Sequence, residues 1–528
     1  MKPEAREIRT VTHEPFGLRR LVGFLGGILL FLVVLTMPPP AGMSPQAQKM
    51  AAVVALMAAW WITEATHISV TALIPLAAYP LLGIMPSTEV APHYANHLIF
   101  LYVGGFVIAL AMEKWNLHRR VALATIAKVG TRPRRLVLGF MIATAMLSMW
   151  VSNTATTMMM LPVAMAVVLQ IAESARIDGR RDEATPERVK IVFGRVLLLG
   201  VAYSASIGGI GTIVGTPTNV AFLGFAAERF PHLEPISFLD WCLVAVPVVA
   251  VFLPLAWIYL CRFGGEVSLS RIEFTATATV IEEERAKLGP MSSPEKTVLA
   301  VSAATALLWI FRQPIQIGEV TIPGWSMLFP EARFLHDATV AVVAAVVLCL
   351  LPVNRAGGMA WRGRWERFMM DWRTIEQGLP WGIVFLFGGG FALAAGMEQS
   401  GLAAWFGQGL ANLAGTPVWV IFPAACLLAV LLTEMTSNVA TVLMIAPVLA
   451  EAAIEFGVHP YLLLFPATLM ASFAFMLPVA TPPNAVVFSS GWITVPAMFK
   501  AGVALDALAL VIVPAIVYVL GSMVFQFG

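Results

Sequence analysis

Two short polar phrases interrupt otherwise apolar stretches of this chain, and their residue types suit ion binding. Ser152-Asn153-Thr154 and Ser437-Asn438-Val439 stand 285 residues apart. Each is followed by a second polar break, Thr216-Pro217-Thr218-Asn219 in the first case and Thr481-Pro482-Pro483-Asn484 in the second. Polar, helix-breaking residues inside an apolar layer are costly unless they line a cavity or bind something.

Each break can start a helix in the middle of the apolar layer. Ser152 or Asn153 suits the N-cap of a helix over 154–170, and Pro217 after Thr216 suits a first helical position. Such a helix points free N–H groups and the positive end of its dipole into the site, which favours an anion. No Lys or Arg lies in the four phrases, so neutral donors, helix ends and nearby cations are expected to hold the anion.

The same breaks offer oxygen atoms to a hard cation. The glycines before the first break let carbonyl oxygens turn toward the site, and carbonyl and hydroxyl oxygens suit Na⁺. The second half repeats the pattern with Thr433, Thr436, Ser437 and Asn438 at the phrase and Ala480, Thr481 and Pro482 at the break. We therefore predict two cation positions and one anion between helix N-termini. A single phrase of this kind is more often explained by polar contacts between packed helices, but two matched copies favour ligand binding.

The two halves of the chain repeat each other. The segments 100–106 and 385–391 align at the same offset of 285 residues as the two phrases, and so do Met112-Glu113 and Met397-Glu398. The second breaks align at an offset of 265, so the first half carries 20 more residues, which the charged loop 174–195 accounts for. Two repeats around a central site, inverted relative to each other, are typical of a secondary transporter.

Composition places these elements in a membrane. The chain has 528 residues, of which 59% are hydrophobic and only 12% charged, against roughly 25% charged in soluble domains. We predict an all-α polytopic membrane protein with about eleven transmembrane helices and two re-entrant hairpins, 136–173 and 418–455. The predicted spans are 21–37, 46–63, 66–85, 97–127, 190–226 (broken), 241–261, 296–312, 336–352, 378–410, 461–490 (broken) and 503–527.

The distribution of basic residues orients the predicted spans. Lys and Arg concentrate in the segments 128–135, 174–195, 262–296 and 355–373, which the topology places on the cytoplasmic side with the N-terminus. Eleven spans put the C-terminus outside, and a bacterial inner membrane is the expected location. The four cysteines fit neither a metal spacing nor a disulfide framework.

The predicted organisation has four parts. Residues 1–45 form an N-terminal cytoplasmic segment and the first transmembrane helix, and residues 263–295 form a cytoplasmic linker. The first inverted repeat, 46–262, holds scaffold helices, the hairpin 136–173 and the broken helix 190–226. The second, 296–528, holds scaffold helices, the hairpin 418–455 and the broken helix 461–490. No nucleophile with a base and no metal triad lies at membrane depth, so an enzyme is not expected.

Several segments resemble the divalent anion–sodium symporter family of carboxylate transporters, from about residue 46 to the end. They are the paired Ser-Asn phrases, 60–65 with 70–75, Pro380-Trp381-Gly382 with 387–391, and above all 477–484. The resemblance implies an elevator-type homodimer in lipid that imports C4-dicarboxylates such as succinate, malate or fumarate with Na⁺. It implies no nucleic-acid partner.

The resemblance also implies roles for individual residues. The family's first Na⁺ site falls on Ser148, Ser152, Asn153, Gly211 and Gly215, and its second falls on Thr433, Thr436, Asn438 and Ala480. The substrate carboxylates fall on Asn153, Thr154, Ser437, Asn438, Thr481 and Pro482, with Thr216 and Pro217 at the matching break.

One departure from the family bears on the substrate. Val439 occupies a substrate-binding position where the family has threonine, so a hydroxyl that could hold a carboxylate is missing. Two alternatives to Na⁺-coupled dicarboxylate import stay open, a Na⁺-independent dicarboxylate exchanger and a citrate or sulfate transporter on the same fold. Glu434, beside the second phrase, is either a proton or cation relay or a structural hydrogen-bond acceptor.

Overall fold

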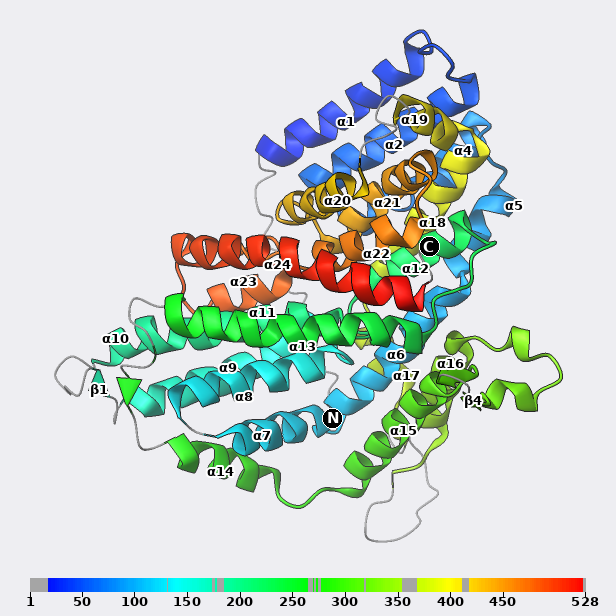
Figure 1. Ribbon diagram of the computed structural model, residues 1–528. Helices are drawn as coiled ribbons and strands as arrows, with labels where there is room; N and C mark the ends of the chain where they lie inside the picture. The colour runs from blue at the N-terminus through cyan, green and yellow to red at the C-terminus, as the bar shows by residue number, and fades with distance from the viewer. Residues whose placement is uncertain are drawn as a thin grey trace, which may run out of the picture.

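The computed structural model describes residues 18–130, 132–172, 176–177, 185–264, 269, 272–273, 277–317, 320–353, 368–410 and 417–525. The predicted N-terminal segment before residue 18 and most of the basic segment 355–373, including Arg355, Arg362, Arg364 and Arg367, lie outside these residues. The described chain is almost entirely helical, as predicted (Figure 1).

The first half of the chain contributes thirteen α-helices among the described residues. They are α1 (Leu18–Thr36), α2 (Pro45–Thr63), α3 (Ile68–Thr71), α4 (Ile74–Leu82), α5 (Ser87–Val90), α6 (His97–Lys114), α7 (Leu117–Val129), α8 (Pro133–Ser148), α9 (Asn153–Ala172), α10 (Pro186–Val189), α11 (Arg195–Gly209), α12 (Pro217–Arg229) and α13 (Phe238–Phe263). A 3-10 turn, η1 (Ala91–Ala95), precedes α6, and a π-helical turn, η2 (Lys190–Gly194), precedes α11.

The second half follows a charged helix, α14 (Thr277–Leu288). Its helices are α15 (Ser293–Ile310), α16 (Asp337–Leu350), α17 (Trp372–Gly378), α18 (Trp381–Gln399), α19 (Leu402–Leu410), α20 (Val418–Thr433), α21 (Asn438–Glu455), α22 (Pro460–Ala471), α23 (Pro482–Phe488) and α24 (Val495–Val524). The 3-10 turns η4 (Trp325–Leu328) and η5 (Ala332–Phe334) lie between α15 and α16. Two short antiparallel strand pairs also occur among the described residues, β1 (Arg176–Ile177) with β2 (Ile272–Glu273) and β3 (Ile315–Ile317) with β4 (Val320–Ile322).

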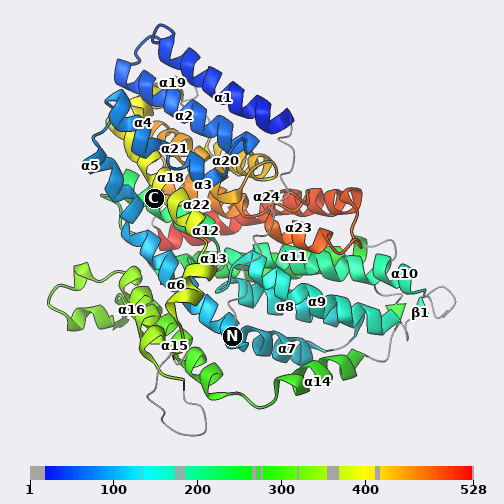
Figure 2. The same cartoon turned by 180° about the vertical axis from the view of Figure 1, so that it is seen from behind.

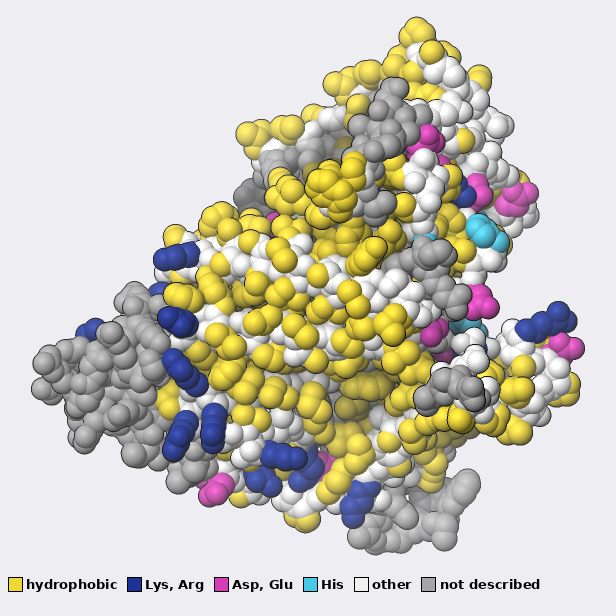
Figure 3. All heavy atoms as spheres, viewed as in Figure 1, with side chains coloured by type: hydrophobic (Ala, Val, Ile, Leu, Met, Phe, Trp, Pro, Cys, Tyr) yellow, Lys and Arg dark blue, Asp and Glu magenta, His cyan; other side chains and the backbone are white. Residues whose placement is uncertain are grey.

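The surface of the molecule is that of a membrane protein. Seven helical segments within the described residues are long and apolar enough to cross a membrane, and several shorter apolar helices lie beside them. The long helices α13 and α24 expose apolar side chains such as Ile258 and Val511, so their outer faces suit lipid. Basic side chains gather along one edge, near the ends of α7, α9 and α13 and the start of α8 (Figure 3). The indole N–H of Trp257 in α13 donates to the Arg134 carbonyl of α8 at that edge.

Two predicted spans are bent rather than straight. The segment 97–127 breaks between α6 and α7 at Asn116, whose φ is 58°, and 378–410 breaks between α18 and α19 at Gly401, whose φ is 77°. Left-handed backbone ends a helix, and Asn and Gly are the residues that adopt it most easily. The two bends stand 285 residues apart, the same offset as the phrases, so the predicted single spans were wrong at corresponding points of the two repeats.

The two polar phrases lie at the tips of helical hairpins, as predicted. The helices α8 and α9 flank the first phrase, and α20 and α21 flank the second. The helix α11 packs along α8 and α9, while α22 packs along α20 and α21. Figures 1 and 2 show the first hairpin beside α11 and α13, with the second hairpin on the other side of α24.

Close helix packing fixes α6 and α18 beside these hairpins. A Cβ on Gly104 of α6 would lie 2.6 Å from the Ala341 backbone of α16. In α18, a Cβ on Gly388, Gly389 or Gly390 would lie within 2.4 Å of Tyr94, Ala72 or Leu443. The run of three glycines therefore serves close packing against three different neighbours.

Candidate functional site

The tip of the first hairpin is shaped by its own phrase. The helix α8 ends at Ser148, and its hydroxyl donates a hydrogen bond to Oδ1 of Asn153, the first residue of α9, over 2.6 Å. The hydroxyl of Ser152 accepts from the backbone N–H of Ala155 at 3.3 Å, as an N-cap does. The Ser148 hydroxyl thus holds Oδ1 of Asn153 inside the hairpin, and the Asn153 side chain lies against Gly209 of α11, where an added Cβ would be 3.0 Å from Nδ2.

The second tip repeats this arrangement. Thr433 ends α20, and its hydroxyl lies 2.8 Å from Oδ1 of Asn438, the first residue of α21, and 2.5 Å from the Ala471 carbonyl. The hydroxyl of Thr436 pairs with that of Thr441 at 2.8 Å. Ser437 is the N-cap of α21, but its side chain makes no capping bond. The first N–H groups of α21 therefore have no side-chain acceptor from the cap residue.

Each break is an unwound segment held by one asparagine. Thr216 and Thr481 are the extended N-cap residues of α12 and α23, which begin at Pro217 and Pro482 as predicted. The amide Nδ2 of Asn219 donates to the carbonyls of Gly209 and Thr212 at 3.2 and 2.8 Å. At the corresponding place, Asn484 donates to the carbonyls of Ala474 and Leu477 at 2.9 and 3.0 Å.

These two asparagines hold the backbone of the breaks, a role that the sequence analysis did not assign. Without them the Gly209 and Ala474 carbonyls would lack a donor inside the protein, which is costly in an apolar layer. The signal was present, since both break phrases end in asparagine at matched positions.

Carbonyl oxygens converge where the first tip meets its break. A Cβ on Gly215 would lie 2.5 Å from the Gly209 oxygen, 2.9 Å from that of Ser148 and 3.1 Å from that of Met149. The hydroxyl of Thr212 donates to the same Met149 carbonyl at 2.5 Å. Clustered carbonyl oxygens suit a hard cation such as Na⁺. A Cβ on Gly211 would instead meet the Met149 side chain, so Gly215 is the glycine of this pair that three carbonyl oxygens surround.

The predicted residues differ in how accessible they are. Ser148, Gly211, Gly215, Thr216, Thr433, Thr436, Val439, Ala480 and Thr481 are buried, whereas Ser152, Asn153, Thr154, Pro217, Ser437 and Asn438 are half-buried and Pro482 is exposed. The tips thus present the phrase side chains, and the buried set lies behind them. The Thr481 hydroxyl is buried without a hydrogen-bond partner, so it is free for a ligand.

Helix packing joins the two halves crosswise. The helix α9, which starts at the first tip, packs against α23, and α21, which starts at the second tip, packs against α12. Each helix that begins at a tip thus packs on one that begins at the break of the other half.

Charged groups stay outside the phrases except for Glu434. The Glu434 carboxylate accepts backbone N–H bonds from Met476 and Leu477 at 2.8 and 3.1 Å, so it is a hydrogen-bond acceptor that ties the second tip to its break. No group of three or more His, Cys, Asp or Glu suited to a metal ion occurs in the described part of the chain.

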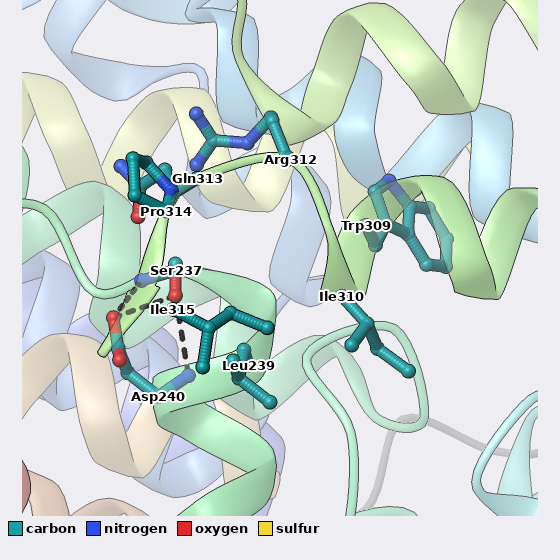
Figure 4. A pocket seen from close by; sticks show the side chains of 9 residues that line it. All are labelled: Ser237, Leu239, Asp240, Trp309, Ile310, Arg312, Gln313, Pro314 and Ile315. Carbon is teal, nitrogen blue, oxygen red and sulfur yellow. Dashed lines mark hydrogen bonds between the residues drawn. The ribbon is translucent and has the colours of Figure 1, made fainter. Parts of the chain in front are cut away.

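A small cavity lies away from this site and is not a second candidate for ligand binding. It lies between the start of α13 and the end of α15, has about 40 Å³ of space, and includes Ser237, Asp240 and Arg312 in its lining (Figure 4). Ser237 and Asp240 are engaged in a capping box, and Arg312 is bonded to Asp337. The cavity is sized for water rather than for a ligand.

The sequence matches one family model over nearly its whole length. Residues 19–527 match the model described as the sodium:sulfate symporter transmembrane region. The chain belongs to the sodium:sulfate symporter family. This assigns it to a family of membrane transporters, not to a family of enzymes.

Curated relatives of this sodium:sulfate symporter family member carry a more specific name. The chain is 38% identical over 508 residues to a protein of Staphylococcus saprophyticus named sodium-dependent dicarboxylate transporter SdcS, covering 96% of this chain and 92% of that one. The protein of that name from Staphylococcus aureus is 37% identical over 506 residues, with the same coverage.

Solved transporters share the fold of the chain at low sequence identity. The YdaH transporter of Alcanivorax borkumensis aligns with a TM-score of 0.53 and 12% identity, covering 96% of this chain and 97% of that one. Neisseria gonorrhoeae MtrF aligns with a TM-score of 0.55 and 11% identity, covering 98% and 96%. These likenesses concern the fold alone.

Proposed function

We propose that the protein is a secondary transporter that imports a dicarboxylate together with Na⁺. The observation that carries this proposal is the pair of matched tips, in which Ser148 and Thr433 orient Asn153 and Asn438 at the starts of α9 and α21. Relatives 37–38% identical over nearly the whole chain are named sodium-dependent dicarboxylate transporters. C4-dicarboxylates such as succinate, malate and fumarate are the proposed substrates.

The proposed cation positions lie behind the tips. The first uses Ser148, Ser152 and Asn153 with the carbonyl oxygens around Gly215, which converge within 3.1 Å of one point. The second uses Thr433, Thr436 and Asn438 with Ala480 at its break. Oxygen ligands of this kind are typical of Na⁺ sites at interrupted helices.

The proposed anion site lies in front of the cations. The amides of Asn153 and Asn438, the hydroxyls of Thr154, Ser437 and Thr481, and the helix starts at Pro217 and Pro482 supply neutral donors and positive dipole ends. Val439 contributes an apolar contact in place of a donor. Because no Lys or Arg lies in these phrases, the anion depends on the cations for charge balance. Loss of the cations then releases it, which couples the two.

The wider assembly follows the same proposal. The two repeats are proposed to be inverted in the membrane, with the hairpins and broken helices forming a mobile transport unit. The helices α6 and α18 are proposed to belong to a scaffold that also forms a homodimer. The N-terminus is proposed to lie in the cytoplasm and the C-terminus outside a bacterial inner membrane, which is supported by the basic ends of α7, α8 and α13 along one edge (Figure 3).

Uptake into proteoliposomes tests the proposal. Radiolabelled succinate should accumulate only with an inward Na⁺ gradient, and replacement of Na⁺ by choline should abolish accumulation. Uptake that ignores Na⁺ but needs dicarboxylate inside the vesicles would establish an exchanger instead. Competition by unlabelled malate, fumarate, citrate and sulfate defines the substrate, and stronger competition by citrate or sulfate than by any C4-dicarboxylate would overturn the substrate assignment.

A further inference from the structure

A second carboxyl group lies against Glu434 behind the second tip. Asp506, in the membrane-spanning helix α24, is only 2% exposed, and Glu434 is 5% exposed. The Glu434 carboxyl and the Phe475 N–H face Asp506, but neither Asp506 oxygen accepts a hydrogen bond of normal geometry. The helix α24 approaches so closely here that a Cβ on Gly502 would lie 2.4 Å from the Phe475 backbone.

No basic side chain balances these two carboxyl groups. Neither Glu434 nor Asp506 takes part in an ion pair within the described ranges. The nearby titratable group is Tyr203 of α11, and its hydroxyl lies 2.8 Å from the Phe475 carbonyl and 3.3 Å from that of Met498. Tyr203 is thus a neutral donor to backbone oxygens. Two adjacent buried carboxylates with no positive charge beside them are strongly unfavourable.

The pair of acids, Glu434 and Asp506, occurs in the second half of the chain and has no acidic counterpart in the first. At the offset of the tips, Glu434 corresponds to Met149. Counted from the first residues of α13 and α24, Phe238 and Val495, Asp506 corresponds to the buried Val249. The first half thus packs two apolar side chains where the second places two acids. The two acids are therefore specific to the second half, and the repeat itself does not account for them.

We propose that Glu434 and Asp506 together bind one further monovalent cation, Na⁺, separate from the two positions at the tips. Asp506 supplies carboxylate oxygens that accept no hydrogen bond of normal geometry, although the Phe475 N–H lies beside them. Glu434 keeps its backbone N–H partners, Met476 and Leu477, and adds the second negative charge. The cation would thereby be linked to the unwound segment between α22 and α23, the same segment that carries Ala480. The identity of the ion rests on the proposed function, whereas the need for a positive charge does not.

Counting bound ions tests the site independently of transport. Equilibrium binding of ²²Na⁺ to the purified full-length protein should fall by one ion per protomer in Asp506→Asn. It should fall by the same single ion in Glu434→Gln and in the double variant, because both acids serve one site. Tyr203→Phe is the matched control, since it removes a neighbouring hydroxyl without changing charge, and it should bind the wild-type number.

Stability measured in choline separates binding from a structural role. Removing one of two uncompensated buried charges should raise the melting temperature of Asp506→Asn in choline and shrink the stabilisation by Na⁺. Asp506→Val, which restores the residue type of the first half, should behave alike and serves if the Asn variant does not fold. Wild-type ion counts in both Asp506 variants would overturn the proposal. Unchanged ion counts with altered proton uptake would overturn it too, because the pair would then hold a proton. If the wild-type protein did not transport succinate but the ion counts changed in the variants as expected, the proposed function would be contradicted while the cation site would stand.

Discussion

The hydroxyl of Ser148 donates a hydrogen bond to Oδ1 of Asn153 over 2.6 Å, across the tip of the first hairpin. Thr433 and Asn438 stand in the same relationship at 2.8 Å in the second hairpin. In each case the last residue of one helix orients the first residue of the next. The amide oxygen of each asparagine is used inside the hairpin, and we propose that the amide nitrogen binds the substrate.

Removing either tip amide should therefore remove a donor to the substrate. Asn153→Ala and Asn438→Ala are each expected to weaken succinate binding about 10- to 100-fold, because a hydrogen bond to a charged group contributes about 1.5–3 kcal/mol. Thermal-shift titration with succinate in saturating Na⁺ measures this. Thr125→Val is a suitable control, since its hydroxyl bonds only within α7. Wild-type affinity in both alanine variants would refute the assignment of the tips.

The space left by Gly215 gives a prediction for the first cation position. Gly215→Ala places a methyl group 2.5 Å from the Gly209 oxygen and about as close to two others, so it should fill the proposed position and reduce stabilisation by Na⁺. The matched control is Gly26→Ala in α1, where an added Cβ would meet no atom within 4 Å. Melting temperatures in Na⁺ and in choline report the effect. An unchanged response to Na⁺ in Gly215→Ala would place the ion elsewhere.

Asn219 and Asn484, the asparagines of the two breaks, are expected to affect the stability of the protein more than its affinity for substrate. Asn219→Leu and Asn484→Leu each leave one carbonyl without a donor, that of Gly209 or of Ala474, at a cost of about 1–3 kcal/mol per orphaned group. We expect both variants to melt at clearly lower temperatures than the wild type, with or without succinate. Asn→Asp should be no better, since a carboxylate cannot donate. A wild-type melting curve for either leucine variant would show that the unwound segment keeps its structure without the asparagine side chain.

Val439 gives a prediction about specificity. Val439→Thr adds a hydroxyl of nearly the same volume at the second position of α21, beside the half-buried Asn438. The expected result is a changed ranking of malate, citrate and succinate as competitors of uptake, with little change in stability. Val439→Ala tests volume without the hydroxyl. Identical competition profiles for the threonine variant and the wild type would make the hydroxyl irrelevant to substrate choice.

The hairpins and breaks were predictable because polar residues inside apolar runs have few structural explanations. Helices begin at Pro217 and Pro482, as expected from the preference of proline for the first position of a helix. The repeat offsets matched the two phrases and the two breaks to each other, but they did not predict the hydrogen bonds that Asn219 and Asn484 make.

Other features depend on tertiary contacts that one sequence does not contain. The bends at Asn116 and Gly401 lie inside segments whose hydropathy is nearly continuous, so composition favoured single spans. The proximity of Asp506 to Glu434 was equally invisible, since 72 residues separate them in the chain. Only the close approach of α24 at Gly502 brings the two acids together.

The bonds that shape each tip are made within its own half of the chain. Ser148 bonds Asn153, and Thr433 bonds Asn438, so neither tip relies on the other for its geometry. A substitution at one tip therefore leaves the bonds of the other tip in place. Thr154 and Val439 differ at corresponding positions of the two halves, and so do Met149 and Glu434. Each half nevertheless keeps its own hydrogen bond across the tip, so the two tips can differ in chemistry while sharing one geometry.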